Sequence, residues 1–287
     1  MDIEELKKLR QSYISTRNTY LIIAGIIFAV FIAFSIMIGI PQLFFFGLVV
    51  LFIIYVIIVG SKKQKFVGEY KKVVMPLALQ QVMTDAIFDE KYSGILNYVE
   101  GRIISRGNKR HCGDYVKGNY KGINVELSEM YIAYETTDSD GNTDTTVYFS
   151  GVWFIFDFNK TFKDNLLVHS KNYGYAVRFG EKIDTEDVDF NNKFRIRSNN
   201  NLEAFYILTP HIMEKIKQLN EKIKCYLIMY FEDSKLHIGL GGYKNLFEPN
   251  VNEEIDIEKF KDAILKDLSV VFELVETLDL DNDLFKK

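Results

Sequence analysis

The chain has 287 residues, of which 48% are hydrophobic and 26% charged, and its formal net charge is −4. Aromatic residues are plentiful and proline is rare, which excludes a disordered chain. The charge is unevenly placed: residues 1–19 carry +1 and residues 61–75 carry +4, so residues 76–287 carry −9. An acidic body repels nucleic acid, so no nucleic-acid partner is expected. Two cysteines, Cys112 and Cys225, indicate a reducing compartment without a disulfide framework.

Residues 21–59 contain no Asp, Glu, Lys, Arg or His, and a Gly-Ile-Pro-Gln break at residues 39–42 divides this run. Roughly 20 helical residues, rising about 1.5 Å each, cross a hydrocarbon core of about 30 Å. The run therefore predicts a transmembrane helical hairpin over residues 20–60, with spans at Tyr20–Ile38 and Leu43–Val59. A cleaved signal peptide fits less well, because a second span follows at once.

Basic residues flank both spans on the same side, whereas the connection between the spans is uncharged. They are Lys7, Lys8, Arg10 and Arg17 before the first span, and Lys62, Lys63, Lys65, Lys71 and Lys72 after the second. The positive-inside rule then places both termini in the cytoplasm of a bacterial cell, with the hairpin in the cytoplasmic membrane. The lipid bilayer is the first partner, and each basic residue near an anionic leaflet is worth about 1 kcal/mol.

Three small residues, Gly25, Ala29 and Ala33, recur every fourth position of the first span. Such spacing lets helix backbones approach closely, so these residues are predicted to pack helices in the membrane. The neighbour is either the second helix of the same hairpin or another copy of the chain in a homo-oligomer. Because the spans carry no charged side chain, a channel or transporter within one chain is excluded.

Beyond the membrane the sequence predicts an α+β fold, with a mainly antiparallel sheet and flanking helices. We expect a cytosolic N-terminal segment at residues 1–19, a juxtamembrane basic helix and connector at 61–90, and a cytosolic domain at 91–287. Pro76 is expected to interrupt the juxtamembrane helix. A short helical stripe of Leu79, Val82, Met83 and Ala86 should follow.

Alternating residues predict a half-buried strand from Ile123, and its parity slips near Glu129, which indicates a bulge. A hairpin turn at residues 138–144 leads to the nearly continuous apolar run 147–158, typical of a strand buried on both faces, with a kink at Ser150-Gly151. A second hairpin is expected around residues 232–234.

Two helices follow from local signals. Thr209 and Pro210 resemble the N-cap and first residue of a helix whose inner face is Ile212, Ile216 and Leu219. A final amphipathic helix is predicted from residue 257 to Leu278, because its apolar residues step by three and four.

Several motifs together resemble one bacterial family. They are Gly113–Gly118, Ser128-Glu129, Phe149–Phe154, Asp157–Lys160, Val188–Phe190, Phe194–Ser198 and Leu202–Pro210. The chain is identified as a member of the domain-of-unknown-function family thirty-one thirty-seven. The resemblance implies two membrane helices and a cytosolic α+β domain, with no established activity, and it suggests a LemA-like membrane protein as a partner. Family members tend to carry charged residues where Asn200 and Phe205 stand, which favours a structural role for that motif here.

No motif predicts catalysis. His111-Cys112 has the residue types of a nucleophile and base, but neighbours in a strand point apart and nothing lowers the thiol pKa. The single, scattered Cys and His residues exclude a structural zinc site, and the acidic residues around Gly141 depart from the spacing of a calcium loop. We therefore expect no catalytic residue, no metal and no cofactor.

A basic stripe is the candidate binding site. Lys193, Arg195 and Arg197 alternate with Phe194 and Ile196, which places the three cations on one face of a strand. They would bind an anionic ligand or the acidic face of a partner. The alternative is a solvated strand that charge protects from aggregation.

The sequence thus predicts an uncharacterised integral membrane protein with a protein- or ligand-binding module at the inner leaflet, without catalysis. The first alternative is a membrane-bound enzyme whose dispersed carboxylates, such as Asp114, Glu129, Asp157 and Glu203, converge in space. The second is an oligomeric membrane scaffold built through the face of Gly25, Ala29 and Ala33.

Overall fold

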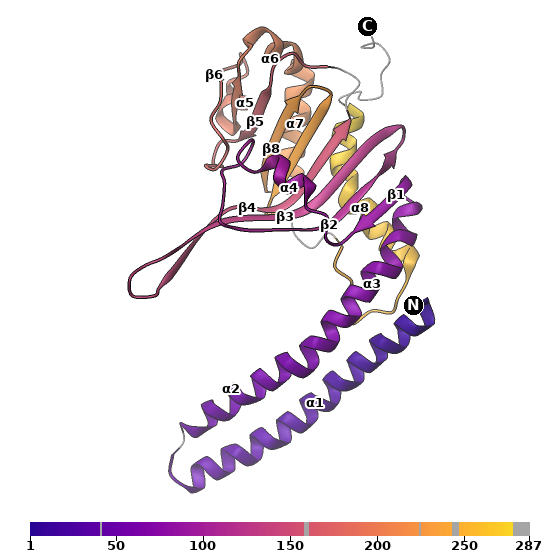
Figure 1. The fold of residues 1–287 in the computed structure, drawn as a ribbon, viewed down its shortest axis with the longest axis vertical. Helices are drawn as coiled ribbons and strands as arrows, with labels where there is room; N and C mark the ends of the chain where they lie inside the picture. Colours follow the sequence, from indigo (N-terminus) through magenta and orange to yellow (C-terminus); the bar gives the residue numbers. More distant parts are fainter. Residues whose placement is uncertain (41, 158–160, 224, 243–246, 278–287) are drawn as a thin grey trace. The chain divides into compact units, whose positions relative to one another are not determined.

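The computed structural model describes residues 1–40, 42–157, 161–223, 225–242 and 247–277, which form two compact units (Figure 1). The first unit comprises Met1–Ala78 and Phe247–Phe260. The second comprises the described residues from 79 to 242 and from 261 onward. The short stretch 247–260 therefore belongs with the N-terminal helices, although it lies inside the range 91–287 expected for the cytosolic domain.

Two long helices make up most of the first unit. They are α1 (Ile3–Met37) and a continuous helix that passes from α2 (Leu43–Tyr55) through the π-helical turn η1 (Val56–Gly60) into α3 (Ser61–Gln80). By length and composition, both are long and apolar enough to cross a membrane. Gly47 lets them approach, because a Cβ there would lie 2.7 Å from the ring of Phe31. The N-terminus of α1 is capped by Asp2, which accepts from the Glu5 amide at 2.7 Å.

The expected interruption at Pro76 is wrong, because α3 continues through this residue to Gln80. A proline inside a helix removes one backbone hydrogen bond and costs about 3 kcal/mol. Val74, Met75 and Ala78 around it are fully buried. Burial of their apolar surface offsets that cost and keeps the segment helical.

A small apolar cluster lies at the polar end of the first unit. It is formed by the buried residues Leu6, Phe66, Tyr70 and Val74, with partly buried residues that include Val251, Ile255 and Phe260. Polar contacts hold the returning segment as well: Arg10 Nη2 donates to the Asn252 carbonyl at 2.8 Å, and Lys71 pairs with Glu248 at 3.1 Å. Residues 247–260 are thus packed onto α1 and α3.

In its described residues, the second unit contains a sheet of nine antiparallel strands in the order β1-β2-β3-β4-β9-β8-β5-β7-β6. Their bounds are β1 (Thr84–Asp89), β2 (Lys109–Tyr120), β3 (Ile123–Thr137), β4 (Thr143–Asp157), β5 (Leu166–Ser170), β6 (Glu181–Ile183), β7 (Phe194–Ser198), β8 (Tyr226–Glu232) and β9 (Lys235–Gly241). The α+β class is confirmed. The helical stripe expected from Leu79 is wrong, because β1 occupies Thr84–Asp89.

The helices are α4 (Gly94–Val99), α5 (Val188–Lys193), α6 (Asn201–Ile207), α7 (Pro210–Ile223) and α8 (Ile257–Thr277). The predicted cap of α7 is confirmed, since the Ile212 amide donates to Thr209 Oγ1 at 3.3 Å. The last helix is confirmed from Ile257 to Thr277, and Leu278 lies outside the described residues. Figure 1 shows α4 in front of the sheet and α7 behind it.

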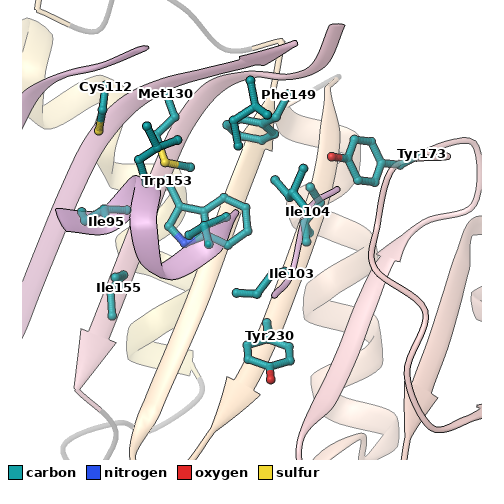
Figure 2. Packing of buried hydrophobic residues seen from close by; sticks show 14 of the residues in the cluster. Ile95, Ile103, Ile104, Cys112, Met130, Phe149, Trp153, Ile155, Tyr173 and Tyr230 are labelled. Carbon is teal, nitrogen blue, oxygen red and sulfur yellow. The ribbon is translucent and has the colours of Figure 1, made fainter. Parts of the chain in front are cut away.

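From Gly151 to Phe156, β4 is buried on both faces, within the apolar run for which this was predicted. Phe154 and Phe156 stack with ring centroids 6.0 Å apart, and Phe156 meets Phe272 of α8 edge to face. Trp153 and Ile155 join the opposite cluster beneath α4, where Figure 2 shows Trp153 among Ile95, Ile103 and Phe149. Alternate residues of one strand thus supply two cores.

The bulge expected near Glu129 is confirmed, and its extra residue lies on β2. The β2–β3 register shifts between Gly113 and Val116, opposite Ser128. Asp114 accordingly has a φ of 51°, in the left-handed region. The buried Ser128 hydroxyl donates to the Gly113 carbonyl at 2.7 Å, which supplies a partner inside the bulge.

Candidate functional site

A hollow of about 280 Å³ lies in the second unit, next to the Gly151–Gly241 pair at the end of β9. Among the described residues, four tyrosines line it: Tyr148 of β4, Tyr173 and Tyr175 of the chain after β5, and Tyr226 of β8. The volume is close to the lower limit for small-ligand pockets. The hollow is therefore a candidate binding site built mainly from aromatic side chains.

The tyrosines form a continuous chain of ring contacts. Ring centroids are 4.8 Å apart for Tyr148 and Tyr175, 6.1 Å for Tyr175 and Tyr173, and 5.8 Å for Tyr173 and Tyr226. Tyr134 of β3 extends the chain outward, with its ring 6.3 Å from that of Tyr148. These separations lie in the range of favourable aromatic pairs.

The tyrosines of this row differ in burial: one is buried at the floor of the hollow, and others are exposed at its rim. Tyr173 is 5% exposed, and its hydroxyl donates to the Tyr148 carbonyl at 2.9 Å. Burial raises the pKa of Tyr173, so its hydroxyl stays protonated. Tyr226 and Tyr134 are 47% and 44% exposed. The rim tyrosines can therefore contact a ligand while Tyr173 fixes the floor.

A second, more open hollow of about 660 Å³ adjoins the first and shares Asn172, Tyr226, Gly241 and Gly242 with it. Its other lining groups include Ser170, Asn192, Lys193, Asn220 and Cys225. Amide side chains can both donate and accept hydrogen bonds. Burial raises the pKa of the Cys225 thiol to about 11, so this residue is a neutral wall and not a nucleophile.

The backbone around the hollow depends on glycine. At Gly151, where β4 first pairs with β9, a Cβ would lie 1.9 Å from the Leu240 carbonyl oxygen. The Gly242 amide then donates to the Ser150 carbonyl at 2.7 Å. β9 ends at Gly241, and the tyrosine-lined hollow lies next to this last pair of the two strands. The kink predicted at Ser150-Gly151 marks this close approach.

A buried polar cluster lies beneath α4 in the same sheet. The Trp153 indole donates to Nδ1 of His237 at 3.2 Å, so the neutral imidazole carries its proton on Nε2. His237 is fully buried, and its Nε2 has no hydrogen-bond partner among the described residues. Tyr98 stacks on the imidazole at 4.9 Å, and both Tyr98 and Arg102 donate to Glu232.

Residues 147–280 match the model of the family described as "Protein of unknown function (DUF3137)". We refer to residues 147–280, which are similar to this family over just under half of the chain, as the DUF3137 region. The resemblance drawn from the motifs is thereby confirmed, and it assigns no activity.

Among solved structures, the chain is similar to the crystal structure of the mycobacterial trehalose monomycolate transport factor A, TtfA. The two are 9% identical with a TM-score of 0.41, and the match covers 71% of this chain and 93% of that chain. A likeness of this size carries no argument about function. No curated protein matches the sequence significantly.

The predicted basic stripe is divided between two elements of the DUF3137 region. Lys193 is the last residue of α5 and pairs with Glu221 at 3.0 Å and Asp189 at 3.4 Å. Arg197 donates to the carbonyls of Phe179 and Gly180 at 3.1 Å. Arg195 is exposed on β7, which lies between β5 and β6. Binding by these three residues stays a prediction.

The small residues of the first span lie on α1, in the first unit. Gly25, Ala29 and Ala33 are all exposed, and a Cβ on Gly25 would meet nothing within 4 Å. The contact between the two long helices uses Phe31 and Gly47 instead. This face is therefore open to lipid or to another chain.

The carboxylates of the enzyme alternative have separate surroundings. Asp114 lies at the β2 bulge beside the strand position of Glu129, and Asp157 pairs with Lys235 at 3.1 Å. Glu203 in the DUF3137 region accepts the backbone amides of residues 163 and 164 at 2.7 and 3.1 Å. Glu203 lies in α6, and Asn200 caps this helix by accepting a hydrogen bond from the Glu203 amide. This motif therefore ties a loop to α6, as a structural role requires.

The His111-Cys112 pair is not arranged as a nucleophile and base. Cys112 is buried, and burial raises the pKa of its thiol, while His111 is exposed. The Cys112 sulfur lies 3.0 Å from the Ser128 hydroxyl. Within the described ranges, no group of three or more His, Cys, Asp or Glu side chains is placed to hold a metal ion.

The sequence pattern does not reveal the tyrosine-lined hollow. Its members come from β4, a loop and β8, so no spacing along the chain joins them. The available signals were the Tyr-Gly-Tyr motif at 173–175 and the large number of tyrosines, 17 in all.

Proposed function

We propose that the protein is a membrane-anchored binding module that holds a ligand or a protein segment in the tyrosine-lined hollow and performs no catalysis. The observation that carries this is the chain of tyrosine rings around a hollow whose rim is exposed. Tyrosine is enriched at binding sites because it offers a large apolar surface and a polar tip at little entropic cost.

The anchor supports the same proposal. The two long apolar helices and their basic flanks favour a hairpin in the bacterial cytoplasmic membrane, with both termini in the cytoplasm. A module held at the membrane meets membrane-bound partners at a raised effective concentration. A weak binding site is therefore sufficient when the partner lies in the same bilayer, as a LemA-like protein would.

The orientation predicts the position of a C-terminal reporter. An alkaline phosphatase domain fused after Lys287 should stay inactive, and a green fluorescent protein at the same position should fluoresce, because the C-terminus is cytoplasmic. The matched control is the same pair of fusions placed in the uncharged connection near residue 40, where the signals should be reversed. An active phosphatase after Lys287 would contradict the inner-leaflet orientation.

The binding role predicts a site-specific adduct. A photoreactive benzophenone residue at position 226, introduced into the full chain in intact cells, should give a discrete adduct of higher mass on irradiation. The same residue at Tyr206, a tyrosine of α6 that is also largely exposed, is the control and should give none. Adding Tyr175→Ala should reduce the adduct at 226, because it removes one wall of the hollow.

Equal labelling at 206 and 226 would contradict a specific site, and so would an adduct at 226 that Tyr175→Ala leaves unchanged. Tyr175 is only partly buried, so its truncation should leave the fold intact. Unchanged Trp153 fluorescence would verify this, because Trp153 is the sole tryptophan and lies in the core beside the hollow.

A further inference from the structure

The outer half of β4 has a strand neighbour on one side only. β4 pairs with β3 from Thr143 to Phe156, but it pairs with β9 only from Gly151 to Asp157. Along Thr143–Phe149 the side facing away from β3 therefore has no strand partner in the described part of the chain. Figure 1 shows this part of the β3–β4 hairpin extending beyond the sheet. We call residues 134–147 the arm.

The two edges of the arm are not equivalent. On the β3 edge, the Asn108 side chain donates to the Glu135 carbonyl and accepts from the Glu135 amide, both at 2.7 Å. Asn108 thus takes the place of a paired strand there. On the β4 edge, the Tyr173 hydroxyl donates to the Tyr148 carbonyl at the base of the arm, and no strand of the described residues pairs with Thr143–Phe149. An unpaired strand edge is a template for another extended chain.

The arm is acidic throughout. It contains Glu135, Asp138, Asp140 and Asp144 and no Lys, Arg or His. Lys109 neutralises Glu135 at 2.5 Å, and Asp138 is used within the turn, where it accepts the Asn142 amide at 2.8 Å. Asp140 and Asp144 are exposed. The charge therefore favours a cationic occupant and disfavours nucleic acid or an anionic lipid surface.

The arm joins the hollow at its base. Val147 and Tyr148 belong to β4 and also line the hollow, and Val147 is 43% exposed. A strand laid along this edge would lie about 5 Å from β4 and would end over the tyrosine rim. Tyrosine faces attract Lys and Arg side chains as well as apolar ones.

We propose that the β4 edge of the arm binds a basic, extended segment of another protein by strand addition, with one end of that segment reaching the tyrosine-lined hollow. Main-chain hydrogen bonds supply affinity, and the acidic arm selects lysine- and arginine-rich segments. The inference rests on the proposed function of the hollow. Two arms of the same protein repel each other, so edge-to-edge pairing of two copies is not the occupant.

The test measures fluorescence anisotropy of labelled peptides with the full chain in detergent micelles. The probe is a short peptide in which lysine alternates with valine, and we expect it to bind. A peptide with glutamate in place of lysine should not bind. A lysine–valine peptide with alternate amides N-methylated should bind at least about tenfold more weakly, because it loses two or more backbone hydrogen bonds.

A double variant, Asp140→Asn with Asp144→Asn, should weaken binding of the lysine–valine peptide by roughly fivefold and reduce its salt dependence. The matched control is Asp184→Asn with Glu186→Gln, which removes the same charge from an exposed acidic loop and should leave binding unchanged. Equal binding of the N-methylated peptide would overturn the proposal, since recognition would not use the backbone. Equal weakening by the control would overturn it too.

The two proposals fail in different ways. Absence of peptide binding with a persistent adduct at position 226 would overturn strand addition and leave the binding role of the hollow standing. Because two of the comparisons vary only the peptide, the outcome does not depend on how well any variant folds.

Discussion

Replacing Gly151 by alanine is expected to destabilise the sheet unit by at least about 3 kcal/mol. A Cβ at this position would lie 1.9 Å from the Leu240 carbonyl oxygen and 3.1 Å from the Gly241 Cα. Both atoms belong to the backbone of β9, which pairs with β4 from this residue onward. Relief of the clash therefore requires the two strands to separate, and a side-chain rotation cannot provide it.

Urea unfolding of the full chain in detergent micelles would measure this effect, with Trp153 fluorescence as the probe. Gly174→Ala is the matched control, because Gly174 lines the same hollow and a Cβ there would meet nothing within 4 Å. Its stability should change by less than about 1 kcal/mol. A similarly small change for Gly151→Ala would show that the strands are not fixed at this contact.

The elements predicted correctly are those whose signal is local. The absence of charge over residues 21–59 predicts helices, because a chain that crosses a membrane has few alternatives. Alternation predicts β3, and the Thr209-Pro210 pair predicts the start of α7, because each depends only on neighbouring residues. The class of fold followed from the order of these elements.

The missed features depend on distant contacts. Pro76 suggested a helix end, but burial of its neighbours maintains α3. Segment 247–260 carries no pattern of its own, and its place in the first unit is set by contacts such as the bond from Arg10 to Asn252, 242 positions away. Lys193 was expected to share a strand face with Arg195, but the strand begins only at Phe194.

The tyrosine-lined hollow shows the same limit for function. Tyr148, Tyr175 and Tyr226 lie far apart in sequence, and the fold brings two strands and a loop together at the hollow. The basic stripe attracted attention because its members are neighbours in sequence. Two of its three residues are engaged with groups of the same unit, which the sequence pattern alone does not reveal.

Acidification should destabilise the sheet unit through His237. Burial, together with the positive charges of Lys235 and Arg102, lowers the pKa of this histidine to about 3. The other groups around the ring are Tyr98 and Tyr230, which have raised pKa values because they are buried. Trp153 donates to Nδ1 and fixes the neutral form. The native state therefore resists protonation of His237.

The direction of the pH dependence follows from the protonation of His237 in the native and unfolded states. An unfolded histidine has a pKa of about 6.5, so between pH 6.5 and 3 the unfolded chain binds a proton that the native sheet does not. The free energy of unfolding that neutral His237 contributes is fully present above pH 6.5. It declines by about 1.4 kcal/mol per pH unit as the pH falls below that value. Between pH 6.5 and 4.5 the loss attributable to His237 should be roughly 2 to 3 kcal/mol.

Urea midpoints of the full chain at several pH values would measure how steeply the free energy of unfolding falls with pH. The comparison is with His237→Gln, whose amide oxygen can still accept a hydrogen bond from Trp153. Exposed carboxylates contribute to the acid dependence of both proteins, so the difference between their slopes isolates the imidazole. His211→Gln, on the exposed side of α7, should keep the native slope. If His237→Gln keeps it as well, His237 is not held neutral by burial, and its unpaired Nε2 must be reached by water.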